Sequence, residues 1–83
     1  MKSRFSIELT DFFNKENIQT AKDNFIKLGY EISSSEAIKV IDTDIRLKLG
    51  DEVWVSEIGD ILCVEEVAFD LDDNEIQYYL GIK

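Results

Sequence analysis

The feature that most limits the fold of this chain is the alternation of apolar and polar residues from Ala37 to the C-terminus. Alternation with a period of two is typical of strands that bury one face against a core. Gly-Asp pairs at 50–51 and 59–60 and the acidic stretch at 70–75 interrupt it about every ten residues, as tight turns do. The strands that the pattern predicts are 37–41, 44–49, 52–58, 61–69 and 76–82.

The N-terminal part of the chain changes from one period to another. Residues 4–9 alternate and predict a further strand. The next apolar residues are spaced as one stripe of a helix: Ile18, Ala21, Phe25 and Leu28. We expect this helix to end at Gly29, because glycine adopts the left-handed conformation that closes many helices.

Together these segments predict an α+β fold in which all 83 residues (1–83) form one domain. We expect a strand and helix over 1–32 to pack on a curved, mostly antiparallel sheet over 37–83. The stretch LKLGDEVWV is similar to the strand–turn–strand segments of SH3-like barrels. The sheet is therefore predicted to be a meander or a small SH3-like barrel.

The residue types argue against an enzyme. The chain has no histidine, and its four glycines stand singly, so it offers neither the usual general base nor a phosphate-binding loop. The one cysteine, Cys63, lies among apolar neighbours and is expected to be a small core residue. Adjacent carboxylates on a strand point to opposite faces and do not converge by themselves. We therefore predict no catalytic residue, no cofactor and no metal ligand.

The stretch FDLDDNEIQYY (69–79) partly matches the pattern of a calcium-binding loop. Asp70, Asp72 and Asn74 have the alternate spacing of calcium ligands. The sixth position of such a loop requires glycine and the twelfth requires glutamate, whereas this chain has Glu75 and Gly81 there. The alternating flanks favour a hairpin turn with its carboxylates in solvent.

The distribution of charge is the strongest functional signal. The net charge is −9, and residues 1–41 balance to zero, so the excess lies in 42–83. Between Lys48 and Lys83 every charged side chain is acidic. Such a field repels nucleic acid phosphates and attracts a basic protein. The expected charge donors are Asp51, Glu52, Glu57, Asp60, Glu65, Glu66, Asp70, Asp72, Asp73 and Glu75.

Two aromatic residues are candidate anchors for a protein partner. If Val53 and Val55 face the core, Trp54 faces outward, and by the same alternation Tyr79 faces outward between Tyr78 and Leu80. Tryptophan and tyrosine contribute much of the binding energy in protein interfaces. The other possibility for Trp54 is burial under the N-terminal helix.

The location of the protein is expected to be the cytoplasm. No apolar run approaches the roughly 18 residues of a membrane span. Glu8 and Asp11 interrupt any apolar stretch of a signal peptide. A single cysteine fits a reducing compartment.

A short acidic chain with no active-site motif resembles the small phage-encoded inhibitors that mimic nucleic acid, such as anti-CRISPR and anti-restriction proteins. The resemblance implies a host cytoplasmic partner: a nucleic-acid-binding enzyme whose basic channel the inhibitor occupies. The alternative is a small-barrel adaptor or structural module of a phage or cytosolic assembly, acidic for solubility alone. A homodimer is possible in either case.

Overall fold

The structure of the protein is a computed structural model that describes residues 1–12, 18–55 and 59–82. It contains one α-helix, a short 3-10 helix and six strands, which confirms the α+β prediction. The elements are β1 (Lys2–Glu8), η1 (Leu9–Phe12), α1 (Ile18–Lys27), β2 (Glu31–Ser33), β3 (Glu36–Asp42), β4 (Glu52–Val55), β5 (Asp60–Asp70) and β6 (Glu75–Ile82).

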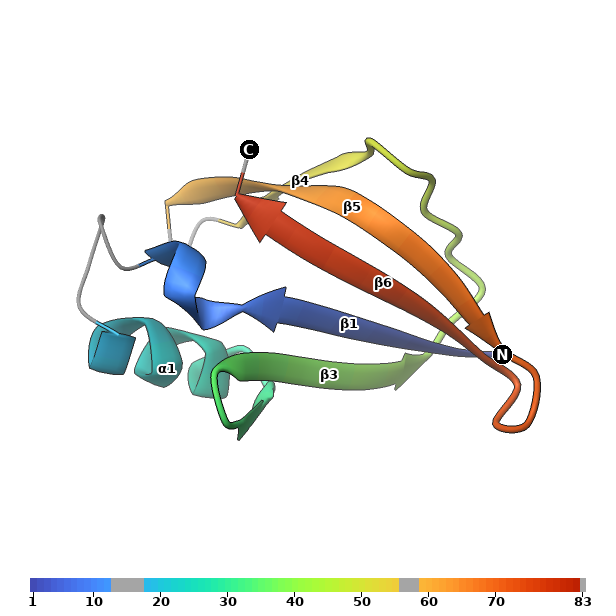
Figure 1. Cartoon of the computed structure of the whole chain (residues 1–83), viewed down its shortest axis with the longest axis horizontal. Coiled ribbons are helices and arrows are strands. Elements are labelled where there is room, and N and C mark those ends of the chain that lie inside the picture. Colours follow the sequence, from blue (N-terminus) through green and yellow to red (C-terminus); the bar gives the residue numbers. More distant parts are fainter. Residues whose placement is uncertain (13–17, 56–58, 83) are drawn as a thin grey trace.

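The strands form one open sheet in the order β2-β3-β1-β6-β5-β4 (Figure 1). The barrel prediction was wrong, since the edge strands β2 and β4 do not pair with each other among the described residues. The N-terminal strand β1 lies at the centre of the sheet, antiparallel to β3 and parallel to β6. The prediction of a continuous meander over 37–83 was also wrong, because β1 from the segment 1–32 lies between β3 and β6, and of the later strands only β4, β5 and β6 follow one another as neighbours.

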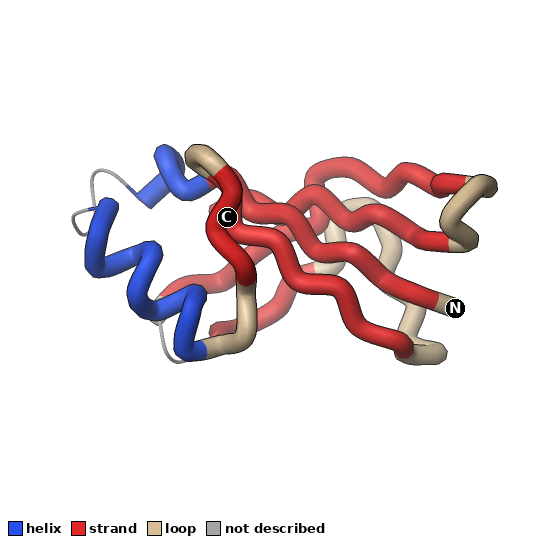
Figure 2. The backbone as a smooth tube through the Cα atoms, turned by 90° about the horizontal axis from the view of Figure 1, so that it is seen from below, coloured by secondary structure: helices blue, strands red, loops and turns tan. Residues whose placement is uncertain are grey.

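The helix α1 lies at one end of this sheet, together with η1 (Figure 2). Its buried residues Ala21 and Phe25 come from the apolar stripe that predicted the helix. Gly29 follows with a φ of 91°, and its N–H bonds to the Ile26 carbonyl at 3.0 Å, which confirms the predicted end of the helix. The described helices include none long and apolar enough to span a membrane.

One face of the sheet, called the inner face here, supplies the core. The alternate residues that point to it are buried together with Ala21 and Phe25 of α1. At its centre the rings of Phe5 and Tyr78 stack with centroids 5.3 Å apart. The buried apolar strand residues of the inner face are Ile7, Ala37, Leu62, Val64, Ile76, Tyr78 and Leu80.

The segment 43–50 corrects one strand prediction. Its residues Ile45, Leu47 and Leu49 alternate as a strand would, yet the segment pairs with no strand. It instead lies against the core, where the Leu47 N–H donates to the Tyr78 hydroxyl at 3.2 Å. Alternation alone cannot distinguish a strand from an extended segment that is held by hydrogen bonds outside a ladder.

Cys63 corrects another prediction. It pairs with Glu52 on one side and Gly81 on the other, and it lies on the face opposite to Leu62 and Val64. The thiol is half-buried and is directed to the carbonyl of Val64 at 3.8 Å. Cys63 is therefore outside the main core, because strand alternation places it between two core residues.

Candidate protein-binding face

The face of the sheet opposite to the core is called the outer face here. By strand alternation it carries every second side chain of the paired strands. Its basic residues within the described strands are Lys2 and Arg4, both at the N-terminal end of β1. Its acidic residues are Glu8, Glu31, Glu36, Asp42, Glu52, Glu65, Glu66, Asp70 and Glu75.

A β-bulge in β5 sets the position of two of these acids. Val64 pairs with Leu80 and Glu66 pairs with Tyr79, so Glu65 is an extra residue in the ladder. A bulge of this kind directs two consecutive side chains to the same face. The expectation that Glu65 and Glu66 point to opposite faces was therefore wrong, because it assumed an unbroken alternation.

Gly81 provides the space that Glu65 occupies. A Cβ atom added to Gly81 would overlap the Glu65 carboxylate, so that carboxylate lies directly over the glycine backbone. Gly81 follows Leu80 and pairs with Cys63 on the outer face. The bulge and the missing side chain together bring Glu65 inward over β6.

The result is an acidic hollow of about 150 Å³ on the outer face. Glu8 and Glu36 are direct cross-strand partners on β1 and β3, and Glu65 reaches the same hollow from β5. The ring of Tyr79 forms a further wall, and its hydroxyl donates to Gln77 at 3.1 Å. Three carboxylates and an aromatic ring form a suitable environment for a lysine or arginine side chain.

The two predicted anchors both lie on the outer face. Trp54 is 61% exposed, which excludes its burial under the helix. It pairs across the ladder with Ile61, which is also exposed. Tyr79 is partly exposed beside the acidic hollow. The alternation that predicted both orientations is confirmed.

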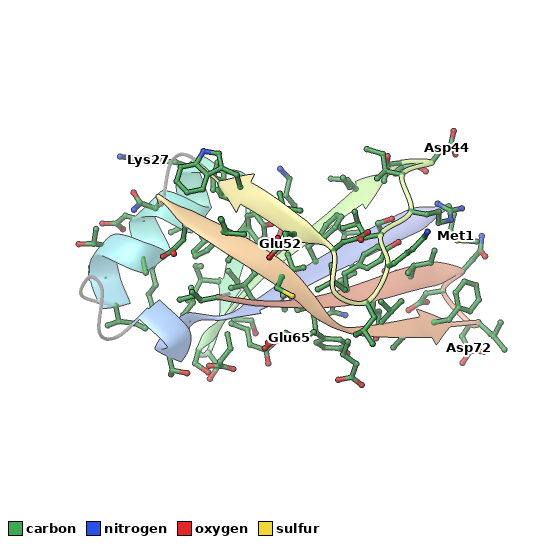
Figure 3. The ribbon with its side chains drawn as sticks, turned by 90° about the horizontal axis from the view of Figure 1, so that it is seen from above. Met1, Lys27, Asp44, Glu52, Glu65 and Asp72 are labelled. Carbon is green, nitrogen blue, oxygen red and sulfur yellow. The ribbon has the colours of Figure 1, made fainter. Side chains whose placement is uncertain are left out.

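The predicted charge donors lie in different parts of the structure. Glu52, Glu65, Glu66 and Asp70 lie on the outer face, whereas Asp72 is at the tip of the β5–β6 hairpin, at the far end of the sheet from α1 (Figure 3). Asp73 belongs to the same turn, and Glu57 lies outside the described residues. Asp51 lies directly before β4, and Asp60 is the first residue of β5, opposite Val55.

Several of these acids have local structural roles. One Asp70 carboxylate oxygen accepts the N–H groups of Asp72 and Asp73 at 3.0 and 3.3 Å, which closes the predicted hairpin. Asp51 accepts the N–H of Lys48 at 2.7 Å in the turn before β4. The carboxylates of the two turns thus stabilise the backbone locally.

Glu75 corrects the expectation that all acids of the hairpin point into solvent. It is only 8% exposed, opposite Asp70 and beside Lys2 of β1, and it accepts a hydrogen bond from Gln77 at 3.4 Å. Its burial follows from its place at the start of a central strand rather than in the turn. Glu75 is thus poorly accessible to a partner.

Glu8 and Glu36 are site residues that the charge pattern did not predict, because the first half of the chain has no net charge. Their contribution depends on the pairing of β1 with both β3 and β6, which brings them beside Glu65. In the sequence, these two residues appear only as glutamates at the polar positions of alternating segments. Pairing between strands distant in sequence was needed to join them.

The inner face contains a larger cavity of about 290 Å³, walled mainly by apolar side chains and by Tyr30 and Lys39. The Lys39 ammonium donates to the Leu28 carbonyl at 2.8 Å and lies 5.7 Å from the centre of the Tyr30 ring. Burial raises the pKa of the Tyr30 hydroxyl. Lys39 and Tyr30 thus stabilise the end of α1. The inner-face cavity does not share the concentration of acidic charge that the outer face carries.

Comparison with known proteins gives no relative for this arrangement. No protein family model, curated protein or solved structure matches the chain. Within residues 1–12, 18–55 and 59–82, no cluster of acidic or cysteine side chains is arranged to hold a metal ion.

Proposed function

We propose that this protein is a non-enzymatic binding protein whose outer face docks on a basic protein surface in the place of nucleic acid. The observation that carries the proposal is the acidic hollow, where Glu8, Glu36 and Glu65 from three strands meet beside Tyr79. Carboxylates accept hydrogen bonds from arginine and lysine much as phosphate oxygens do. A surface that binds nucleic acid would offer those side chains.

The placement of the acids supports a functional role over a solubilising one. Glu8 and Glu36 face each other directly across the β1–β3 ladder, and like charges in that position destabilise a sheet. Solubility requires only dispersed charge, and a charged surface of mixed sign would provide it. A small domain that concentrates one sign at this cost gains from a partner of opposite sign.

Trp54 and Tyr79 add apolar contact to this electrostatic attraction. Both are exposed on the face that carries the acids. In this proposal the acids accelerate association with the partner and the aromatic rings slow dissociation. The biological setting that we propose is inhibition of a host defence nuclease by a phage-encoded protein, in line with the class resemblance of the sequence.

The test is displacement of nucleic acid. A panel of purified bacterial nucleases, each holding a fluorescein-labelled DNA duplex, is titrated with the protein while fluorescence polarisation is recorded. We expect release of the duplex from at least one nuclease, with an affinity that falls as salt rises. Failure to displace the duplex from any nuclease would contradict the proposed mimicry.

Two variants with equal changes of charge locate the effect. In the first, Glu36→Gln, Glu65→Gln and Glu66→Gln remove three charges in and beside the hollow; in the second, Asp44→Asn, Asp72→Asn and Asp73→Asn remove three charges away from it. We expect the first to lose about tenfold in affinity or more and the second to change it less than about threefold. Equal losses would show that net charge alone matters, as in a solubilising role.

A further inference from the structure

The strand β5 is longer than its outer neighbour. β4 pairs only with Asp60–Cys63 of β5. At the next residue of β5, the Val64 carbonyl accepts the Gly50 N–H at 2.8 Å and the Val64 N–H donates to the Asp51 carbonyl at 2.9 Å. From Glu65 to Asp70 the outer edge of β5 has no strand beside it within the described chain. Figure 3 shows this strand in orange along the near side of the sheet, ending in the turn that carries Asp72.

The direction of the backbone groups on this edge follows from the ladder with β6. Val64 lies opposite Leu80, and its N–H and C=O both point away from β6, toward Gly50 and Asp51. Beyond the bulge, Val67 and Phe69 lie opposite Tyr78 and Ile76, which continue the same alternation on β6. Their N–H and C=O groups therefore also point outward.

The side chains along this edge differ between the two faces. Val67 and Phe69 belong to the inner-face alternation, yet they are 42% and 50% exposed because α1 covers the other end of the sheet. Glu66, Ala68 and Asp70 belong to the outer face. The edge thus presents free hydrogen-bonding groups, apolar side chains on one face and acids on the other.

The charges along this edge disfavour pairing with a second copy of the chain. In an antiparallel pair of two copies with Val67 opposite Phe69, Glu66 of each copy would lie opposite Asp70 of the other. Like charges directly opposed destabilise a ladder, and each copy adds a net charge of −9. The acids and the bulge therefore disfavour self-pairing, as edge charges often do.

We propose that the Glu65–Asp70 edge of β5 binds an extended basic segment of a protein partner as an additional strand. Apolar side chains of that segment pack beside Val67 and Phe69, and alternate lysines or arginines lie beside Glu66 and Asp70. The backbone bonds provide affinity and the alternation provides specificity. This inference rests on the basic partner of the proposed function and specifies how that partner binds.

The test uses two peptide probes of equal charge. One alternates lysine with valine over eight positions, and the other alternates lysine with proline, which cannot join a ladder because proline lacks an N–H. Both are added to the full-length, ¹⁵N-labelled protein at up to about 1 mM, the range of weak binding. We expect only the lysine–valine peptide to slow amide hydrogen exchange at Val67 and Phe69, by about tenfold.

A pair of variants at one position separates the backbone from the side chain. Val67→Pro removes an outward N–H and leaves the ladder with β6 intact, whereas Val67→Thr keeps the N–H and the branched shape. We expect Val67→Pro to weaken binding of the lysine–valine peptide about tenfold and Val67→Thr to weaken it less than about threefold. The exchange experiment on the unmodified protein decides the matter if Val67→Pro fails to fold.

Two results would overturn the inference. If both peptides bind equally, basic segments dock on the acids without adding a strand, and the proposed function survives. If neither peptide alters Val67 or Phe69, strand addition at this edge is wrong, and displacement of DNA from a nuclease still tests the proposed function separately.

Discussion

The two faces of the sheet are made by the same strands and serve different ends. On the inner face, alternate residues such as Phe5 and Tyr78 pack into a core. On the outer face, the alternate positions of the same strands carry acids, other polar residues and exposed aromatic side chains such as Trp54 and Tyr79. Stability is therefore concentrated on one side of each strand, which leaves the other side free to carry charge that a packed face could not accept.

The adjacent tyrosines 78 and 79 give the largest expected contrast. Tyr78 is buried, stacks on Phe5 and binds the Leu47 N–H, whereas Tyr79 lies on the outer face. We expect Tyr78→Ala to lower the free energy of unfolding by about 3–5 kcal/mol, and Tyr79→Ala to lower it by less than about 1 kcal/mol. Urea unfolding of both variants measures the difference, and equal losses would contradict the division between the faces.

The local sequence pattern correctly predicted which way individual side chains point and where the helix ends. The alternation correctly oriented Trp54 and Tyr79, and the helical stripe correctly ended before Gly29. These features depend on neighbours within a few residues. The sequence could not show that β1 lies between β3 and β6, and it therefore missed the meeting of Glu8 with Glu65.

Two further features were beyond local pattern for physical reasons. The bulge at Glu65 depends on the space left by Gly81 on a different strand. The segment 43–50 has the alternation of a strand, but it is held by hydrogen bonds to residues distant in the chain, such as the one from Leu47 to Tyr78, 31 residues away. Both require knowledge of which strands become neighbours.

Ser3 provides a second way to examine the inner face. It is fully buried, and its hydroxyl has no hydrogen-bond partner. Because an unsatisfied buried hydroxyl is unfavourable, we expect Ser3→Ala to raise the free energy of unfolding by about 1 kcal/mol. A rise in the urea midpoint checks this. A loss of stability instead would mean that the hydroxyl forms a bond in solution.

The Glu8–Glu36 pair tests whether the outer face is under electrostatic strain. We expect Glu36→Gln to raise stability by about 0.5 kcal/mol at low salt, because it removes one of two directly opposed charges. Glu31→Gln is the matched control, since Glu31 lies opposite Ile38. The gain should shrink as salt is added. A stability loss specific to Glu36→Gln would show that its carboxylate is favourably bound.

The smallest expected effect concerns alkaline pH and the end of α1. Burial raises the pKa of Tyr30 above its ordinary value of 10.0. The folded protein therefore retains this proton more tightly than the unfolded chain, so this contribution is complete below about pH 10 and is lost as pH rises through the folded pKa. We expect the melting temperature of Tyr30→Phe to fall less with rising pH above about pH 10 than that of the parent. Melting temperatures measured across this range distinguish the two.

The bulge also has a consequence for how this sequence can change over generations. Removal of Glu65 would leave Val64 pointing inward, Glu66 outward and Val67 inward, so the residues on both sides would stay in phase. Most single-residue deletions in a strand exchange its two faces and destroy the core. At this position we expect the chain to tolerate the loss of one residue, so the charge of the surface can change by deletion while the residues of the interior stay the same.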